Sequence, residues 1–158
     1  MRRKEFTLLY RASRDGFRAS NFHAKCDNQP STLTIIKTTN GYIFGAYTAV
    51  AWDSSNSYKA DPNAFIFSLV NVRSTPLLIP VKVRSNHSIY CIATHGPNFG
   101  GGHDIHIANN SNTVNASYSN LGCSYDLTLF SYRSTEARSF LAGSYNFQTS
   151  EIEVFQLN

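Results

Sequence analysis

The chain reads Thr32-Leu33-Thr34-Ile35-Ile36-Lys37-Thr38-Thr39, then Asn40-Gly41, then Tyr42-Ile43-Phe44-Gly45-Ala46-Tyr47. Both flanking runs are rich in β-branched and aromatic residues, which pack well on a pleated sheet. Asn40-Gly41 between them tolerates the positive φ angles of a type I′ turn, whose twist matches that of the two strands. The segment therefore predicts a β-hairpin, with Asn40 and Gly41 as its structural turn.

Short apolar runs recur on both sides of this hairpin. We expect further strands at residues 6–10, 64–70, 76–80, 88–93, 104–107 and 151–157. The nearly all-apolar run 64–70 predicts a central strand covered on both faces, and the strict alternation of 151–157 predicts a half-buried strand. Pro76 and Pro80 bracket a segment that suits the edge of a sheet.

Helical signals are few and short. Ser20 can cap a helix over residues 21–26, which places Phe22 and Cys26 on one face. A second short helix is expected over residues 135–142, closed by Gly143. These patterns predict a mainly β protein, a two-layer antiparallel β-sandwich with a few short flanking helices.

Length and charge point to one domain with a basic N-terminus. With 158 residues, 42% of them hydrophobic, the chain suits a single domain, which we place at residues 7–158 behind a basic arm of residues 1–6. Seven of the 14 Lys and Arg residues lie in the first 25 positions against two acidic residues, so the remainder is close to neutral. No later cluster of Lys and Arg contains interleaved aromatic residues, so we expect no nucleic acid partner.

The cysteines and the hydropathy favour an intracellular, cytoplasmic protein. Cys26, Cys91 and Cys123 are odd in number, widely spaced and form no CxxC pair, which argues against a disulfide scaffold and a structural zinc site. No apolar run is long enough to span a bilayer, and residues 1–12 lack the apolar core of a signal peptide.

Gly100-Gly101-Gly102 is the most glycine-rich segment. A phosphate-binding P-loop requires GxxxxGK[ST] at the start of a helix, whereas these glycines lead into an expected strand. We interpret all three as a structural turn, where glycine lets the backbone bend.

His103, Asp104 and His106 are weak candidates for metal ligands. On a strand, Asp104 and His106 would share one face while His103 would point to the other, so at most two of them converge. His95 lies one bend away. We expect no bound metal and no cofactor.

Catalytic motifs are sparse. No GxSxG elbow occurs, although a triad can assemble from residues far apart in sequence. Glu151 and Glu153 share one strand face, as acid–base catalysis would need, but this placement also suits the wet face of an amphipathic edge strand. If the protein is an enzyme, we expect a metal-assisted or hydrolase-like one that uses groups near 95–106 and 151–153. A carbohydrate-binding sandwich is a further alternative that the aromatic content permits.

Ser13-Arg14-Asp15-Gly16 is the most concentrated polar motif. Asp-Gly fits a tight turn, and Asp side chains close such turns onto the backbone. The motif is either a fold-defining turn or a loop that faces a partner. We take Ser13, Arg14, Asp15 and Gly16, together with Glu151 and Glu153, as candidates for an interaction site.

Several segments, in this order along the chain, resemble the TLDc domain of oxidation-resistance proteins. They are Leu8–Phe17, Phe22–Asp27, Thr32–Lys37, Asn40–Tyr47, Ala64–Leu69, Phe99–Gly102 with Asp104-Ile105, and Glu151–Phe155. Together they cover residues 7 to 157. Only Met1 to Thr7 precede the Leu8-Leu9-Tyr10 segment, where family members usually carry extra helical sequence, so the chain resembles a divergent member.

The resemblance implies a β-sandwich flanked by short helices, which agrees with the strand pattern. It also implies a role in oxidative-stress resistance and, as for several relatives, binding to peripheral subunits of the vacuolar proton-pumping ATPase. No enzymatic reaction is attached to the family. We therefore expect a non-catalytic protein-interaction module that is a monomeric domain of a longer protein.

Overall fold

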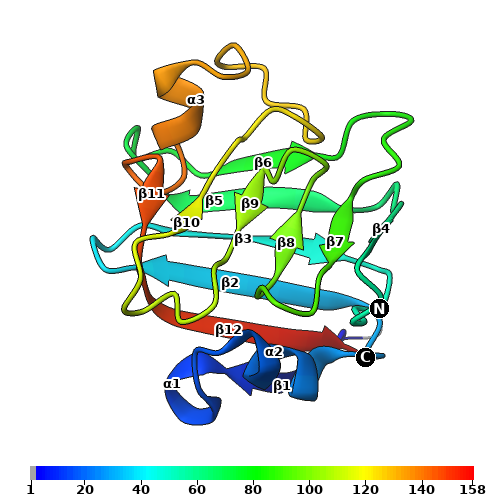
Figure 1. Ribbon diagram of the computed structural model, residues 1–158. Coiled ribbons are helices and arrows are strands. Elements are labelled where there is room, and N and C mark those ends of the chain that lie inside the picture. Colours follow the sequence, from blue (N-terminus) through cyan, green and yellow to red (C-terminus); the bar gives the residue numbers. More distant parts are fainter. Residues whose placement is uncertain (1–2) are drawn as a thin grey trace.

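The computed structural model describes residues 3–158 and shows two antiparallel sheets of six strands each (Figure 1). The predicted fold class, a mainly β two-layer sandwich with a few short flanking helices, is confirmed. Residues 1–2 of the expected basic arm lie outside the described residues, and the first strand begins at Phe6, the last residue of that arm. No helix within residues 3–158 is long and apolar enough to cross a membrane.

The first sheet has the order β1-β12-β2-β3-β5-β6. Its strands are β1 (Phe6–Arg11), β12 (Thr149–Leu157), β2 (Thr32–Thr38), β3 (Ile43–Thr48), β5 (Phe65–Val70) and β6 (Leu77–Pro80). The last strand of the chain thus lies between the first two, so both ends of the described chain are held in one sheet.

The second sheet has the order β11-β10-β9-β8-β7-β4 and lies over one face of the first (Figure 1). Its strands are short: β11 (Asn146–Phe147), β10 (Ser117–Tyr118), β9 (Ile105–His106), β8 (Asn98–Phe99), β7 (Ile89–Cys91) and β4 (Ser57–Lys59). Most of this sheet is made of strands shorter than the runs expected at 88–93 and 104–107, and β10 lies in a polar segment for which no strand was expected.

The predicted hairpin is formed by β2 and β3, whose register pairs Lys37 with Ile43. The prediction of a type I′ turn was wrong. Such a turn needs a positive φ at both central residues, whereas Gly41 has a φ of 87° and Asn40 has no positive φ. Instead, Gly41 donates its N–H to the carbonyl of Thr38 at 3.0 Å. This is the three-residue loop in which a glycine follows a type I turn, so Asn40 needs no unusual backbone angle.

The short helices are α1 (Ala12–Asp15), α2 (Ala19–Cys26) and α3 (Thr135–Ser139). Phe22 and Cys26 are both buried, as their spacing predicted. The expected cap at Ser20 was wrong, because α2 begins at Ala19, two residues before the expected start, and the Asn21 carboxamide accepts the N–H of Arg18 at 3.0 Å. An asparagine three residues into the helix therefore takes the place of a capping serine.

Two expectations about strand environment were also wrong. The run 64–70 forms β5, an interior strand, but its outward side chains are half-buried or exposed, so only one face is covered. Glu151 and Glu153 lie on β12, which alternates as predicted but is interior to the sheet and not at its edge. β6 does lie at an edge, as Pro76 and Pro80 indicated.

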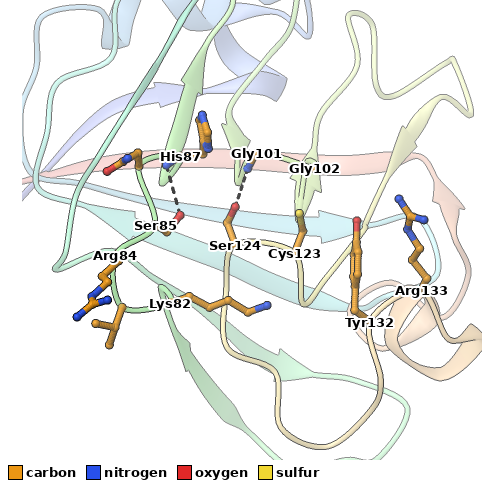
Figure 2. A pocket seen from close by; sticks show the side chains of 12 residues that line it. Lys82, Arg84, Ser85, His87, Gly101, Gly102, Cys123, Ser124, Tyr132 and Arg133 are labelled. Atoms are coloured by element: carbon orange, nitrogen blue, oxygen red, sulfur yellow. Dashed lines mark hydrogen bonds between the residues drawn. The ribbon is translucent and has the colours of Figure 1, made fainter.

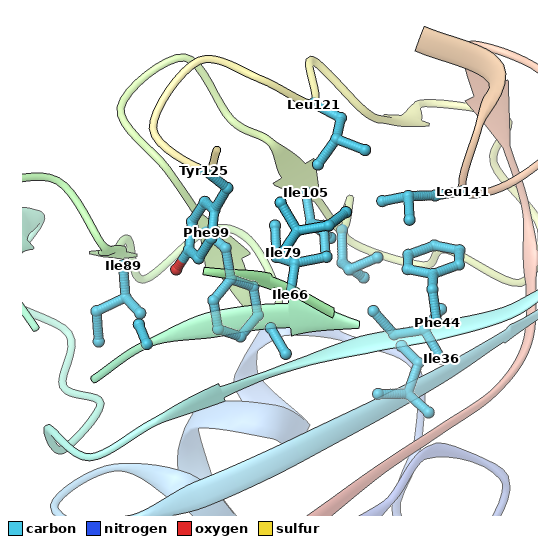
Figure 3. Close-up of a cluster of buried hydrophobic side chains, with 14 of the residues drawn as sticks. Ile36, Phe44, Ile66, Ile79, Ile89, Phe99, Ile105, Leu121, Tyr125 and Leu141 are labelled. Carbon is cyan, nitrogen blue, oxygen red and sulfur yellow. The ribbon is translucent and has the colours of Figure 1, made fainter. Parts of the chain in front are cut away.

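The core lies between the two sheets (Figure 3). The first sheet contributes Ile36, Phe44 and Ile66, and the second contributes Ile89 and Phe99, all of them buried. Each fully buried side chain of this size stabilises the fold by roughly 1.5–3 kcal/mol. The fold therefore needs no cross-link, and all three cysteines are free thiols.

Candidate interaction surface

The structure brings together the two groups of residues that the sequence suggested for interaction. Ser13, in α1, donates its N–H to Glu151 Oε1 at 3.0 Å and its hydroxyl to Glu151 Oε2 at 2.5 Å. Next to it, Arg11 Nη2 lies 3.4 Å from Glu153 Oε2. The end of β1, the helix α1 and the start of β12 thus form one polar cluster, which we call the Ser13–Glu151 cluster.

Arg14 and Asp15 form a two-pronged ion pair within this cluster. Arg14 Nε and Nη2 lie 2.9 and 2.8 Å from the two oxygens of Asp15. Asp15 also accepts the backbone N–H of Arg11 at 3.0 Å. These hydrogen bonds, first of all those from Arg14, lower the pKa of Asp15 to about 2. The carboxylate of Asp15 is therefore held in place, while half of the Arg14 side chain is open to solvent.

Gly16 closes the turn that follows. Its φ is 110°, its N–H donates to the carbonyl of Ala12 at 2.8 Å, and its own carbonyl accepts the hydroxyl of Tyr10 at 2.6 Å. A Cβ at this position would lie 2.3 Å from Asn21 Oδ1. Gly16 is therefore required by the turn that follows α1.

Glu151 and Glu153 are held by separate donors. Each carboxylate has its own donor, Ser13 for Glu151 and Arg11 for Glu153, and both lie on the first sheet. Acid–base catalysis by two carboxyl groups requires environments that separate their roles in a shared site. The arrangement instead suits recognition, because it presents charged groups at the surface in fixed positions.

The histidines near residue 100 gather on the second sheet. The ring of His106 lies 4.6 Å from that of His95 and 5.6 Å from that of His103, and it stacks on Tyr118 at 4.4 Å. Its Nδ1 lies 3.0 Å from Asn98 Oδ1. Burial lowers the pKa of all three histidines, that of His106 to about 3, and their mutual repulsion lowers the values of His103 and His106 further.

Asp104 is turned away from these histidines. It is fully buried, and its carboxylate accepts the backbone N–H groups of Gly122, Ser124 and Tyr125 at 2.9–3.2 Å. The expected pairing of Asp104 with His106 on one strand face was therefore wrong. The reason is that β9 begins only at Ile105 and His103 has a φ of 61°, which breaks the alternation of side chains.

This geometry does not resemble a metal centre. Within residues 3–158, no three His, Cys, Asp or Glu side chains are placed to hold one ion. Burial raises the pKa of Asp104 to about 6, although the backbone donors oppose that rise. Asp104 therefore acts as an anchor for the segment 122–125.

Comparison with known proteins decides the family. A family model described as the TLDc domain matches residues 1–158. The chain belongs to the TLDc family. A curated relative from Danio rerio, "MTOR-associated protein MEAK7", is 26% identical over 62 residues, which is 39% of this chain and 14% of the relative. A protein of the same name from Gallus gallus is 27% identical over 107 residues, 63% of this chain and 22% of the relative. The matches thus span less than a quarter of either relative.

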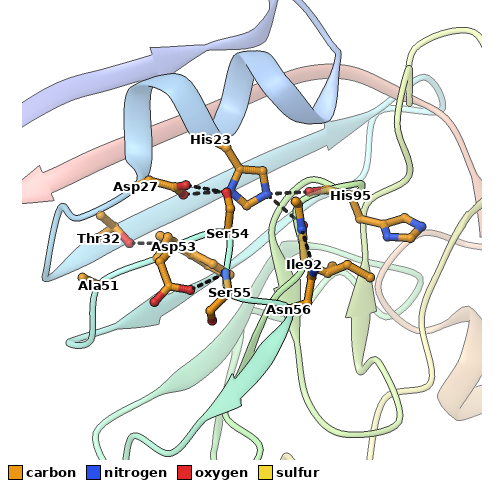
Figure 4. Close-up of polar contacts among 12 residues, drawn as sticks. His23, Asp27, Thr32, Ala51, Asp53, Ser54, Ser55, Asn56, Ile92 and His95 are labelled. Atoms are coloured by element: carbon orange, nitrogen blue, oxygen red, sulfur yellow. Dashed lines mark hydrogen bonds and ion pairs between the residues drawn. The ribbon is translucent and has the colours of Figure 1, made fainter.

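His23 of this TLDc domain forms a set of hydrogen bonds that the sequence reasoning missed (Figure 4). Its Nδ1 lies 2.7 Å from Asp27 Oδ1, and its Nε2 lies 2.9 Å from the carbonyls of Ile92 and His95. Asp27 also accepts the hydroxyl of Ser54 at 2.7 Å. Because both ring nitrogens are engaged, His23 joins α2 to the segment after β7 and has no free nitrogen for catalysis. The spacing of His23 and Asp27, four residues apart on a helix, is the signal that indicates such a pair.

The sequence reasoning also missed a row of aromatic and polar side chains across the second sheet. Tyr58 pairs with Tyr90, Tyr90 with Asn98, Asn98 with His106, and His106 with Tyr118. The rings of Tyr58 and Tyr90 stack at 4.2 Å. Such cross-strand contacts stabilise a sheet made of very short strands. Only the register reveals them, since the strands lie far apart in sequence.

A basic hollow of about 700 Å³ opens beside Gly101 and Gly102 (Figure 2). Lys82, Arg84 and Arg133 line it, and no Asp or Glu is among the residues that do so. Lys82 Nζ donates to the carbonyl of Gly122 at 2.7 Å, so this cation also holds the loop. Lys82 and Arg84 come from one segment, and Arg133 comes from another about 50 positions later in the chain.

The three glycines at 100–102 lie against Asp104 and the segment that Asp104 anchors. Gly100 has a φ of 92°, and a Cβ there would lie 1.9 Å from Asp104 Oδ1. Gly101 donates its N–H to Ser124 Oγ at 2.8 Å, and a Cβ on Gly102 would lie 2.5 Å from Cys123 Sγ. The three glycines thus let the chain pass close to the anchored segment 122–125.

Proposed function

We propose that this chain is a non-catalytic protein-interaction module of the TLDc type, acting inside the cell in resistance to oxidative stress. We further propose that residues 7–158 form one domain behind a basic arm of residues 1–6. Membership of the TLDc family across the whole chain is the observation that carries this function. The Ser13–Glu151 cluster supports it, because it holds Arg14 at the surface in a fixed position.

We propose peripheral subunits of the vacuolar proton-pumping ATPase as the first partner, since that is the partner that the family resemblance implies. Arg14 would supply a charge-assisted contact to a carboxylate of the pump, the kind of hydrogen bond that is stronger than a neutral one. The second candidate partner is MTOR. It is favoured by the two curated relatives, which are both named as MTOR-associated proteins.

An enzymatic function has less support from the geometry. The groups that a metal-assisted or hydrolase-like reaction would use are divided, with His95, His103 and His106 on the second sheet and Glu151 and Glu153 on the first. Asp104, the carboxylate nearest in sequence to the histidines, is occupied by backbone donors. A shared catalytic centre requires its groups within hydrogen-bond reach of one reacting atom.

Affinity capture tests the function. The purified domain is used as bait in a lysate of its own organism, and captured pump subunits and mTOR are quantified by mass spectrometry. The variant Arg14→Ala removes the exposed cation, while Arg84→Ala removes an exposed arginine of the basic hollow. We expect enrichment of pump subunits that Arg14→Ala reduces and Arg84→Ala leaves unchanged.

Each other outcome has a defined meaning. Enrichment of mTOR without pump subunits would replace the first partner by the second. Capture of neither protein by a folded domain would contradict both. Stoichiometric zinc or manganese in protein purified without a His tag would favour the enzymatic alternative.

A further inference from the structure

The outer face of the first sheet, which points away from the second sheet, carries an apolar row in direct cross-strand register. The row crosses all six strands and consists of Leu8, Phe155, Leu33, Tyr47, Phe65 and Pro80. Every member except Pro80, which is exposed, is half-buried. A sheet face that meets water normally alternates to polar residues, so this row is unusual for an uncovered face.

Neighbouring positions extend the apolar area. Ile35, Phe67 and Leu78 follow in the next row, where Leu78 is 59% exposed. Phe6 at one margin is 54% exposed, and Leu69 at another is 49% exposed. Contiguous exposed apolar surface of this kind marks an interaction site. It also explains why the run 64–70 reads like a strand covered on both faces, since its composition suits a covering partner.

A hollow of about 450 Å³ opens on this face, where the first strands of the row begin or end. Leu33, Tyr47 and Phe65 line it, together with Phe6, Asn63 and Leu157. The rings of Tyr47 and Phe65 stack at 5.3 Å, which gives the hollow a firm wall. Interfaces concentrate their binding energy where a large side chain fills such a pocket.

The free charge around the face is positive. Lys4 lines the hollow and Lys37 is exposed on the same side of β2, and neither forms an ion pair with residues 3–158. Of the acidic groups on this face, Glu153 is paired with Arg11. Glu151 lies opposite Lys37 in the strand register and keeps its charge, because its donors from Ser13 are neutral. Lys4, Lys37 and Arg11 therefore outnumber these two carboxylates. Glu5, next to Lys4, does not line the hollow. A partner that carries carboxylates beside its apolar residues would therefore meet unpaired cations.

The dimensions of the face suit a helix. Six strands spaced about 4.8 Å apart give a row roughly 24 Å long. A helix of about 16 residues has that length at 1.5 Å per residue, and its diameter of about 10 Å matches the two apolar rows. The apolar stripe of an amphipathic helix would cover the rows, and its polar margins would lie over Lys4 and Lys37.

We propose that this outer face binds an acidic amphipathic helix of the protein partner, with one large apolar side chain of that helix in the hollow at Tyr47 and Phe65. The inference rests on the proposed interaction function and names the surface and the chemistry of the partner segment.

Fluorescence anisotropy with a labelled synthetic peptide tests it. The probe is an 18-residue helix with Leu and Phe in one stripe and Glu on both margins; a scrambled peptide and a version with Lys margins are the controls. We expect the full chain to bind the Glu probe at least tenfold more tightly than either control. Tyr47→Thr and Phe65→Thr should each weaken binding at least tenfold, whereas Leu129→Thr, which truncates an exposed apolar residue elsewhere, should not.

Charge reversal gives a second measurement that does not disturb the apolar rows. Lys37→Glu should lower affinity for the Glu probe and raise it for the Lys probe, while Lys25→Glu on α2 should change neither.

Equal binding of scrambled and ordered probes, or unchanged binding by both Thr variants with wild-type melting curves, would overturn the proposal. So would a dimer in sedimentation that Phe65→Thr abolishes, because the occupant would then be a second copy. Failure of the wild-type domain to capture the pump or mTOR would contradict the proposed function and not this surface. If Phe65→Thr captured the partner as well as the wild type does, only the proposed surface would be rejected.

Discussion

Ser13 and Glu151, which are 138 positions apart, are joined by two hydrogen bonds to the two oxygens of one carboxylate. One residue lies in α1 and the other in β12, so the contact fixes the first helix against the last strand of the chain. Next to it, the ion pair of Arg14 and Asp15 is held in a single orientation. The surface that we propose for partner binding thus depends on an internal contact.

A double-mutant cycle should measure this contact. We expect Ser13→Ala and Glu151→Gln to be coupled by about 1 kcal/mol in the free energy of unfolding, because each removes one end of a charge-assisted hydrogen bond. Urea titrations of the two single variants and the double variant give the value. As a control, Ser20→Ala at an exposed position of α2 should show no coupling to Glu151→Gln. A coupling of zero for Ser13 would show that the contact does not stabilise the cluster.

Two glycines with similar backbone angles should respond very differently to alanine. Gly41→Ala has open space around its new Cβ, so we expect a cost of about 1 kcal/mol from its positive φ alone. Gly100→Ala places its Cβ against the Asp104 carboxylate, and we expect a further loss of at least about 2 kcal/mol. Thermal or urea unfolding measures both. Equal losses would mean that Asp104 moves freely and does not anchor the segment 122–125.

The first sheet was far more predictable than the second. Residues 32–47 contain two long runs and a glycine turn, and these local signals were enough for the hairpin. The second sheet is built from strands of two or three residues, such as Asn98–Phe99, in which no periodicity can develop. Its strands pair residues that are distant in sequence, such as Tyr58 and Tyr90, so no local pattern predicts which strands are neighbours.

The sequence indicated which residues to consider for the candidate site, but not that they lie close together. The polar motif at Ser13 and the acidic positions at Glu151 and Glu153 stand out in the sequence, yet only the pairing of β1 with β12 brings them together. Asp104 shows the opposite case. Its position beside two histidines suggested a metal ligand, but the positive φ of His103 turns the carboxylate toward backbone donors.

Acid should destabilise the domain through His106. Burial lowers the pKa of His106 to about 3, below its value near 6.5 in an unfolded chain. The stability from its neutral form is therefore present above about pH 6.5 and is lost as pH falls toward 3. Between pH 7 and pH 5 we expect the stability of the wild type relative to His106→Phe to fall by roughly 2 kcal/mol. Urea unfolding at both pH values checks this, and a constant difference would show that His106 titrates normally in the folded state.

Protection from oxidants should not require the thiols. Cys26 and Cys91 are buried, and burial raises the pKa of both thiols, that of Cys91 to about 11, so little reactive thiolate exists at neutral pH. We expect Cys26→Ala/Cys91→Ala/Cys123→Ser to protect peroxide-treated cells as well as the wild type does. Survival curves measure this, with circular dichroism to verify the fold. Lost protection in a folded triple variant would make a sacrificial thiol the mechanism.

The most direct test of the central claim is binding between purified components. The domain is immobilised, and the isolated peripheral sector of the vacuolar proton-pumping ATPase, or in parallel mTOR, is passed over it. The account predicts saturable binding of one of them, weakened at least tenfold by Arg14→Ala and by Phe65→Thr and unchanged by Leu129→Thr. A folded wild-type domain that binds neither protein would contradict it.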